Sequence, residues 1–274
     1  MDDIKDLAYH LGMIGFLIKK NFYDLWDNML RVVLLNLGFL ASLAIPGFSL
    51  GLVFYISPAF IPVFAVGVLW CFVYLSAAAI SLKAVSDYGS FGFADFWANI
   101  KAGWKAGVAM GIAVFMLVLM ITFVLPFYLD MHSLVGLMLA AVIGWTFLLT
   151  LVSLQFFFAI RARLDTKTKK IFKKCFIIFF DNQAFSIFCL LHTIVMTILS
   201  LFTFGLLPGP AGALLFLDEA LRLRLLKYDW LEANPQTEPT RIRRRSIPWD
   251  AILIDEREKT GTRTLKGLIF PWKD

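Results

Sequence analysis

The 274-residue sequence has few charged residues, and this shortage decides its class. Asp, Glu, Lys and Arg make up 17% of the chain, whereas a soluble domain carries about 25%. The hydrophobic fraction is 59%, and the mean hydropathy is +0.76. These values exclude a soluble globular domain, a disordered chain and a collagen-like chain, and they predict an all-α polytopic membrane protein.

Motifs for metal binding and catalysis are also missing. Cys71, Cys175 and Cys189 lie in or beside apolar runs without C-x-x-C spacing, so we expect buried thiols and neither a disulfide framework nor a zinc site. No G-x-S-x-G, H-E-x-x-H, G-x-G-x-x-G or P-loop motif occurs. Asp130 and His132 share one turn without a third partner. The sequence therefore predicts no catalytic residue, cofactor or metal, and a protein that is not an enzyme.

Long stretches without charge locate the membrane spans. About 20 apolar residues cross the hydrocarbon as a helix, and Pro and Gly residues divide the longest stretch in two. The N-terminus is acidic, unlike a secretory signal, so we expect it to be retained. The predicted spans lie near residues 28–46, 60–82, 106–128, 134–160 and 184–205, with a sixth at 211–228 that is short and tilted or partly re-entrant.

Basic residues alternate along the chain and predict its orientation. Lys and Arg cluster before the first span, between the second and third, between the fourth and fifth, and after residue 222, whereas the connections near 47–59, 129–133 and 206–210 contain none. By the positive-inside rule, we expect both termini to face the cytoplasm, with six crossings between them. The predicted organisation is an interfacial helix (1–27), a transmembrane bundle (28–228) and a cytoplasmic tail (229–274).

Two segments outside the spans are amphipathic. Apolar residues from Ile4 to Ile18 recur every three or four positions, which predicts a helix on the inner leaflet or, alternatively, a partner-docking helix. The aromatic segment 87–105 is typical of a membrane interface and should form a helix from Ala94 that enters the third span. A coupling helix of an ABC permease is the alternative, but the glutamate-alanine-alanine signature of such permeases is absent.

Three glycines and two basic clusters are the candidate functional positions. Gly103, Gly107 and Gly111 share one helix face, which predicts close packing within the bundle or homodimerisation. Basic residues on the inner side should bind anionic lipid headgroups or a partner, and nucleic acid is not expected. These residues are Arg161, Arg163, Lys167, Lys169, Lys170, Lys173, Lys174, Arg241, Arg243, Arg244 and Arg245.

The spans contain few groups that could bind or move an ion. Apart from Arg31, the first five contain no Asp, Glu, Lys or Arg, and His192 is the one ionisable group at depth. We expect His192 to be a neutral core residue. Other polar groups should form hydrogen bonds between helices; these are Asn36, Thr150, Ser153 and Gln155. The polar tail should be extended, with an apolar end at 265–272 that folds back or docks.

The layout resembles the YesL-like family of bacterial integral membrane proteins over roughly residues 15–230. The resemblance is carried by Phe22-Tyr23-Asp24-Leu25-Trp26, Leu34-Leu35-Asn36-Leu37, Phe93-Ala94-Asp95-Phe96-Trp97 before Lys101 and Trp104, and Leu206-Leu207-Pro208-Gly209-Pro210. Members of that family accompany carbohydrate ABC-uptake systems and their sensor kinases, so the resemblance implies an accessory role with those partners. It supplies no catalytic or binding residues.

Two functions from different classes follow. The first is an accessory or scaffold protein of the inner membrane, associated with a carbohydrate ABC-uptake system. The alternative is a substrate-translocating permease. A deep polar cavity between the third, fourth and fifth spans would favour the permease, whereas a packed interior would favour the accessory protein.

Overall fold

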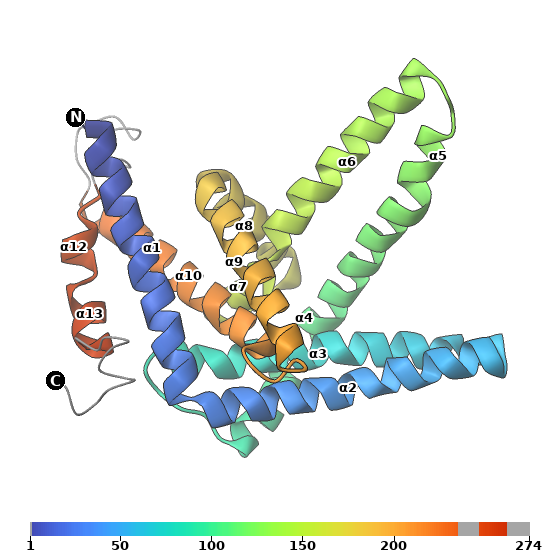
Figure 1. Ribbon diagram of the computed structural model, residues 1–274, viewed down its shortest axis with the longest axis horizontal. Coiled ribbons are helices and arrows are strands. Elements are labelled where there is room, and N and C mark those ends of the chain that lie inside the picture. Colours follow the sequence, from blue (N-terminus) through green and yellow to red (C-terminus); the bar gives the residue numbers. More distant parts are fainter. Residues whose placement is uncertain (1, 235–246, 262–274) are drawn as a thin grey trace. The chain divides into compact units, whose positions relative to one another are not determined.

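The computed structural model describes residues 2–234 and 247–261, with side chains from residue 12 onward, and every regular element in these ranges is helical (Figure 1). Five of its helical segments are long and apolar enough to cross a membrane: Met29–Tyr55, Pro58–Ser86, Phe93–Leu129, Leu134–Arg163 and Gln183–Phe202. The protein is therefore an all-α polytopic membrane protein, as its composition predicts.

The chain forms two compact units. The larger unit comprises Met29–Asp218, and the smaller unit joins the two ends of the chain, Met1–Asn28 and Glu219–Asp274. The predicted bundle begins at nearly the same place, but it was expected to extend to residue 228. The larger unit ends earlier because α10 (Gly209–Ala233) is apolar only in its first half and carries charged residues from Asp218 onward.

The first span is longer than predicted because its proline does not end the helix. The first helix of the larger unit, α2 (Met29–Tyr55), continues through Pro46. A proline removes one backbone hydrogen bond, and membrane helices tolerate this where other groups replace it. Here the Cys71 thiol donates to the Ser42 carbonyl at 3.5 Å, the acceptor four residues before Pro46. The Ser49 hydroxyl donates to the Ile45 and Pro46 carbonyls.

The second and third spans pack closely against each other. The short helix η1 (Pro58–Phe60) leads into α3 (Ile61–Ser86), and α4 (Phe93–Leu119) follows after a short loop. The helix α4 begins at Phe93 and continues into the third span, so the prediction of one helix running from the aromatic segment into that span is confirmed. The Ser76 hydroxyl donates to the Gly103 carbonyl at 3.0 Å across this pair.

The third span ends in a bulge, and the fourth returns from it. A π-type turn, η2 (Met120–Val124), precedes α5 (Leu125–Leu129), whose second residue is Pro126 and cannot donate a backbone hydrogen bond. Ser133 then caps α6 (Leu134–Leu154) by accepting from the Gly136 amide at 3.0 Å. The helix α7 (Phe157–Arg163) completes the fourth candidate span.

The basic segment between the fourth and fifth candidate spans forms a helix of its own, which the predicted spans do not include. This helix, α8 (Thr168–Asp181), buries Ile171, Cys175 and Ile178 and precedes α9 (Gln183–Phe202). Burial raises the pKa of the Cys175 thiol to about 12, which is consistent with an inert core cysteine.

In the smaller unit, α1 (Asp2–Asp27) packs with α12 (Trp249–Ile252) and α13 (Ile254–Thr260). Trp249 and Leu253 are buried, and the Lys19 ammonium donates to the Gly261 carbonyl at 3.2 Å. The prediction of an extended tail is therefore wrong over residues 247–261, because apolar side chains spaced four apart fold this segment onto α1. The apolar end at 265–272 lies outside the described residues.

Candidate functional site

A cavity of about 390 Å³ lies between α2, α3 and the start of α4, all within the larger unit. We call it the aromatic cavity, because six aromatic side chains contribute to its wall. The lining residues are Arg31, Leu34, Leu35, Gly38, Ser42, Trp70, Tyr74, Phe91, Gly92, Phe93, Phe96, Trp97 and Ile100. Its volume falls within the range of small-molecule sites, about 300–1,000 Å³.

One wall depends on the close approach of Tyr74 to α2. The Tyr74 hydroxyl donates to the Leu35 carbonyl at 2.9 Å, and its ring lies 5.1 Å from that of Phe96. A Cβ atom at Gly38 would lie 2.2 Å from the Tyr74 hydroxyl oxygen. Only glycine therefore allows Tyr74 to reach this carbonyl.

A second pair of polar groups is also fully engaged. Trp70 donates its indole N–H to the Ser42 hydroxyl at 3.2 Å, and that hydroxyl donates to the Gly38 carbonyl at 2.9 Å. The side-chain donors of Trp70, Ser42 and Tyr74 are therefore all satisfied within the protein. The surface that they present to the cavity is mainly aromatic carbon.

The start of α4 forms the opposite wall. Asp95 accepts a hydrogen bond from the Gly92 amide at 2.8 Å, which fixes the first turn of the helix. Phe93 and Trp97 pack edge to face with ring centres 5.9 Å apart, and both are substantially exposed. Exposed aromatic rings at the end of a span are typical of a membrane interface.

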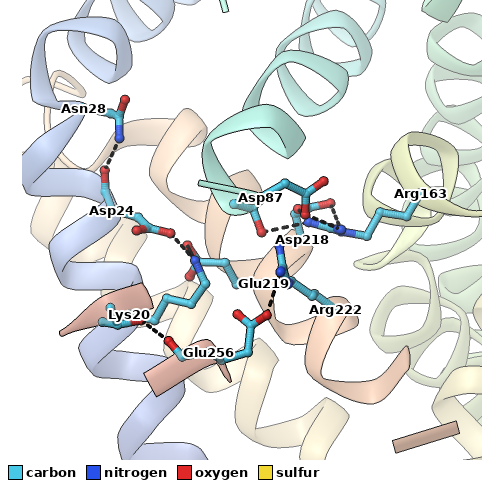
Figure 2. A network of polar contacts seen from close by, with 11 residues as sticks. Lys20, Asp24, Asn28, Asp87, Arg163, Asp218, Glu219, Arg222 and Glu256 are labelled. Atoms are coloured by element: carbon cyan, nitrogen blue, oxygen red, sulfur yellow. Dashed lines mark hydrogen bonds and ion pairs between the residues drawn. The ribbon is translucent and has the colours of Figure 1, made fainter. Parts of the chain in front are cut away.

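A network of charged groups lies at one end of α3 and α7. The Arg163 guanidinium donates to both carboxylate oxygens of Asp218, to Asp87 at 2.9 Å and to the Ser86 hydroxyl at 2.8 Å (Figure 2). Its side chain is 8% exposed and that of Asp218 is 1% exposed. Arg163 was predicted to bind lipid headgroups or a partner, but the structure pairs it with the buried Asp218 and the more exposed Asp87, and thus ties α3, α7 and α10 together.

The other predicted basic residues divide into three groups. Arg161 donates to the Ala102 carbonyl at 2.7 Å, and Lys174 pairs with Asp165 at 3.5 Å. Four lysines are exposed, and only these fit a surface for headgroups or a partner; they are Lys167, Lys169, Lys170 and Lys173. Arg241, Arg243, Arg244 and Arg245 lie outside the described residues.

The three glycines of α4 lie against α3 of the same chain. A Cβ atom would lie 2.7 Å from the Ser76 hydroxyl at Gly103, 2.5 Å from the Val73 Cα at Gly107, and 2.8 Å from a Leu69 methyl at Gly111. The structure thus uses this face for packing inside the bundle, the first of the two roles expected for it.

Asn36 has a larger role than an ordinary interhelical hydrogen bond. Its amide donates to the carbonyls of Leu206 and Pro208, both at 2.9 Å, and accepts from the Ala211 amide at 2.9 Å. Asn36 thereby holds the whole connection between α9 and α10. Gln155 donates to the Ser186 carbonyl at 2.9 Å, and His192 stacks on Phe216 with ring centres 3.8 Å apart.

The smaller unit contains a buried acidic cluster that sequence reasoning missed. Lys20 pairs with Asp24 and lies 4.0 Å from Glu219, whose side chain is fully buried (Figure 2). The side chains of Asp24 and Asn21 also interact with the Glu219 carboxyl group. Burial raises the pKa of Glu219 well above its usual range, and the nearby Asp24 adds to this effect while Lys20 opposes it.

No group of three His, Cys, Asp or Glu side chains is placed to hold a metal ion anywhere in the described ranges. No protein-family model matches the chain, and comparisons with curated proteins and with solved structures give no match. The resemblance to the YesL-like family therefore stays a prediction.

Proposed function

We propose that this chain is a non-catalytic accessory or scaffold protein of the bacterial cytoplasmic membrane. The observation that carries the proposal is the position of its charged groups. Within the five candidate spans, Asp, Glu, Lys and Arg lie toward the ends of the segments, and the deepest of them, Lys105, is the thirteenth of the 37 residues of Phe93–Leu129. Ion-coupled transporters usually carry ionisable groups at depth. The middle of these spans offers only His192, which is stacked on an aromatic ring.

A second observation opposes the permease. A cavity of about 520 Å³ lies between the third and fourth spans, bounded also by Phe172 and Phe176 of α8. Among the described lining residues, only Thr146 and Thr150 have polar side chains, and the Thr146 hydroxyl already donates to the Val142 carbonyl of its own helix. Such an apolar cavity lacks the groups that would replace the hydration shell of a sugar or an ion.

Two exposed surfaces could contact the membrane and a partner protein. Along α1, Ile18, Phe22 and Trp26 are exposed at spacings of four, which suits an interfacial helix. Along α8, Lys169, Lys170 and Lys173 are exposed beside the apolar Ile177. These surfaces can hold the chain at the inner leaflet and contact a partner there. On this proposal the partners are subunits of a carbohydrate ABC-uptake system or its membrane sensor kinase, as the family resemblance implies.

Affinity purification of the tagged full-length chain from its native membrane, followed by mass spectrometry, tests the proposal. We expect permease or ATPase subunits to copurify with the wild type and to be depleted when Lys169, Lys170 and Lys173 are changed to Gln. The matched control changes Lys101 and Lys105, which are also exposed basic residues. In parallel, the purified chain is reconstituted into liposomes. Saturable sugar uptake by the chain alone would make it a permease and refute the accessory role.

A further inference from the structure

The aromatic cavity follows α2 from its charged end into the hydrocarbon. Its lining residues on α2 run from Arg31 to Ser42, and the eleven steps between these two residues rise about 16 Å along the helix. The hydrocarbon core of a bilayer is about 30 Å thick, so one leaflet spans about 15 Å. With Arg31 at the interface, where we expect the charged end of this span, the cavity covers the depth of one leaflet and Ser42 lies near the bilayer centre.

The polar chemistry of the wall excludes a hydrophilic ligand. A site for a sugar or a nucleoside needs unpaired donors and acceptors that face the ligand. The hydroxyls of Tyr74 and Ser42 and the indole N–H of Trp70 are each committed to a protein acceptor. The remaining surface of these residues suits a flexible apolar chain.

The cationic side chain at the end of the cavity indicates which kind of headgroup the ligand carries. Arg31 is the only charged side chain among the described lining residues. A guanidinium forms charge-assisted, bidentate hydrogen bonds with phosphate, so it favours an anionic headgroup. The wall is open toward lipid, because Leu34 and Trp97 are 58% and 49% exposed.

We propose that the aromatic cavity binds one acyl chain of an anionic phospholipid while Arg31 contacts its phosphate. The surrounding bilayer supplies the ligand. The chain lies along α2 from Leu34 to Ser42, and the rings of Trp70 and Tyr74 contact it from α3. This lipid site is independent of the accessory function proposed above.

Fluorescence quenching by lipids with brominated chains tests the proposal on the full-length protein in detergent. Brominated phosphatidylglycerol is titrated against brominated phosphatidylcholine, which has the same chains and no net charge. We expect saturable quenching, with phosphatidylglycerol half-saturating at about tenfold lower concentration, since one charge-assisted contact is worth at least that factor. The titration is made in a Trp97→Phe background, because Trp97 also lines the cavity. In that background Trp70→Phe should remove most of the saturable component.

Substitution of the cation separates a built site from general attraction to a basic surface. Arg31→Gln should raise the half-saturation concentration of phosphatidylglycerol to that of phosphatidylcholine, while thermal unfolding shows that the variant is folded. Lys105→Gln, which removes an exposed cation outside the cavity, should change neither lipid. Equal affinity for both lipids in the wild type, unchanged quenching in Trp70→Phe, or an equal effect of Lys105→Gln would overturn the proposal.

Discussion

Single side chains decide where the helices of the larger unit can meet. Gly209 has a φ of +61°, and a Cβ atom there would lie 2.2 Å from the Asn36 amide nitrogen. A larger residue would therefore separate the α9–α10 connection from the amide that holds it. Gly38 plays the same part for Tyr74. Both glycines give room to one polar group that must reach a backbone acceptor.

Gly107 lies directly against the backbone of α3, so its substitution should destabilise the bundle. In Gly107→Ala, the new methyl group would meet the Val73 backbone at 2.5–2.7 Å, and overpacking of this kind costs about 1–3 kcal/mol. The matched control is Gly144→Ala in α6, where no atom lies within 4 Å of the added Cβ. Thermal unfolding in detergent should show a loss for Gly107→Ala alone. Equal melting temperatures would place the α4 glycines away from any tight contact.

At the scale of elements, the apolar stretches of the sequence predict most of the spans, and the glycine spacing predicts the face on which α4 packs. The glycine spacing of α4 and the aromatic start of that helix are visible in the sequence because both depend on neighbours three or four residues away. The end of α2 is not, because the continuation through Pro46 depends on the Cys71 thiol of another helix. The sequence did not predict α8, because lysines are interspersed among the apolar residues that form its buried face.

Charged contacts were predicted least well, since their partners are far apart in sequence. Arg163 belongs to a basic run by position, yet its partners are 55 and 76 residues away. The Leu206 carbonyl that Asn36 binds is 170 residues away. Glu219 lies in a segment that alternates acidic, basic and apolar residues, and nothing in that segment indicates that Glu219 is buried. The sequence gives the charge of each side chain, but the partner of that side chain is known only once the fold brings the two residues together.

Arg163 stabilises the ends of three helices, so Arg163→Gln should be severely destabilising. It leaves Asp218 buried without its bidentate partner, and breaking one side of a buried pair costs about 3–5 kcal/mol. The double variant Arg163→Gln/Asp218→Asn should recover part of this loss, which a double-mutant cycle of unfolding measurements reveals. Lys174→Gln, which breaks the more exposed pair with Asp165, should change the melting temperature little. Additive single losses would mean that Arg163 and Asp218 do not act together.

Glu219 should make the smaller unit less stable as pH rises. Its pKa is raised in the folded chain, so above about pH 4.5 the folded state keeps a proton that the unfolded state has lost. This contribution is fully present below the unfolded pKa and is lost as pH rises through the folded pKa. Lys20 and Asp24 face Glu219 from α1, whereas the nearby Glu256 of α13 is engaged with Arg222.

Replacement of the titrating group tests this dependence. Glu219→Gln mimics the protonated carboxyl, so its melting temperature relative to the wild type should increase between about pH 5 and pH 8. Glu258→Gln, at an exposed position of α13, should leave the difference constant. A pH-independent difference for Glu219→Gln would show that this carboxyl titrates alike in the folded and unfolded chain.

At the scale of the whole molecule, the ends of the chain restrict the number of crossings. The described tail helices α12 and α13 belong to the same compact unit as α1. Two segments that pack together outside the bilayer lie on the same side of it. Because we predict that α1 and the tail both lie outside the bilayer, we expect the chain between them to cross an even number of times, although five segments are long and apolar enough to cross.

We expect the α9–α10 connection to be a re-entrant turn, which would leave an even number of full crossings. Asn36, which binds it, lies seven residues after the start of α2, or about 10 Å along the helix axis. Irregular backbone at such depth must be satisfied internally. The Ser200 hydroxyl accepts from the Gly209 amide at 2.8 Å, and Thr203 accepts from the Leu207 amide at 3.1 Å. The tip exposes Phe202 and Phe204, which suits contact with lipid chains.

We therefore expect four full crossings and one re-entrant hairpin, with both termini in the cytoplasm. Single cysteines placed in a chain without Cys71, Cys175 and Cys189 can be labelled with a membrane-impermeant maleimide. Ser133→Cys should react in intact cells, and Asp250→Cys should react only after the cells are opened. Phe204→Cys decides between the hairpin and a complete sixth crossing: within the hydrocarbon it should stay unreactive in both conditions, whereas at an outer connection it would react in intact cells. Because the hairpin turn is held by Asn36, Asn36→Leu should make Phe204→Cys reactive while leaving Ser133→Cys unchanged.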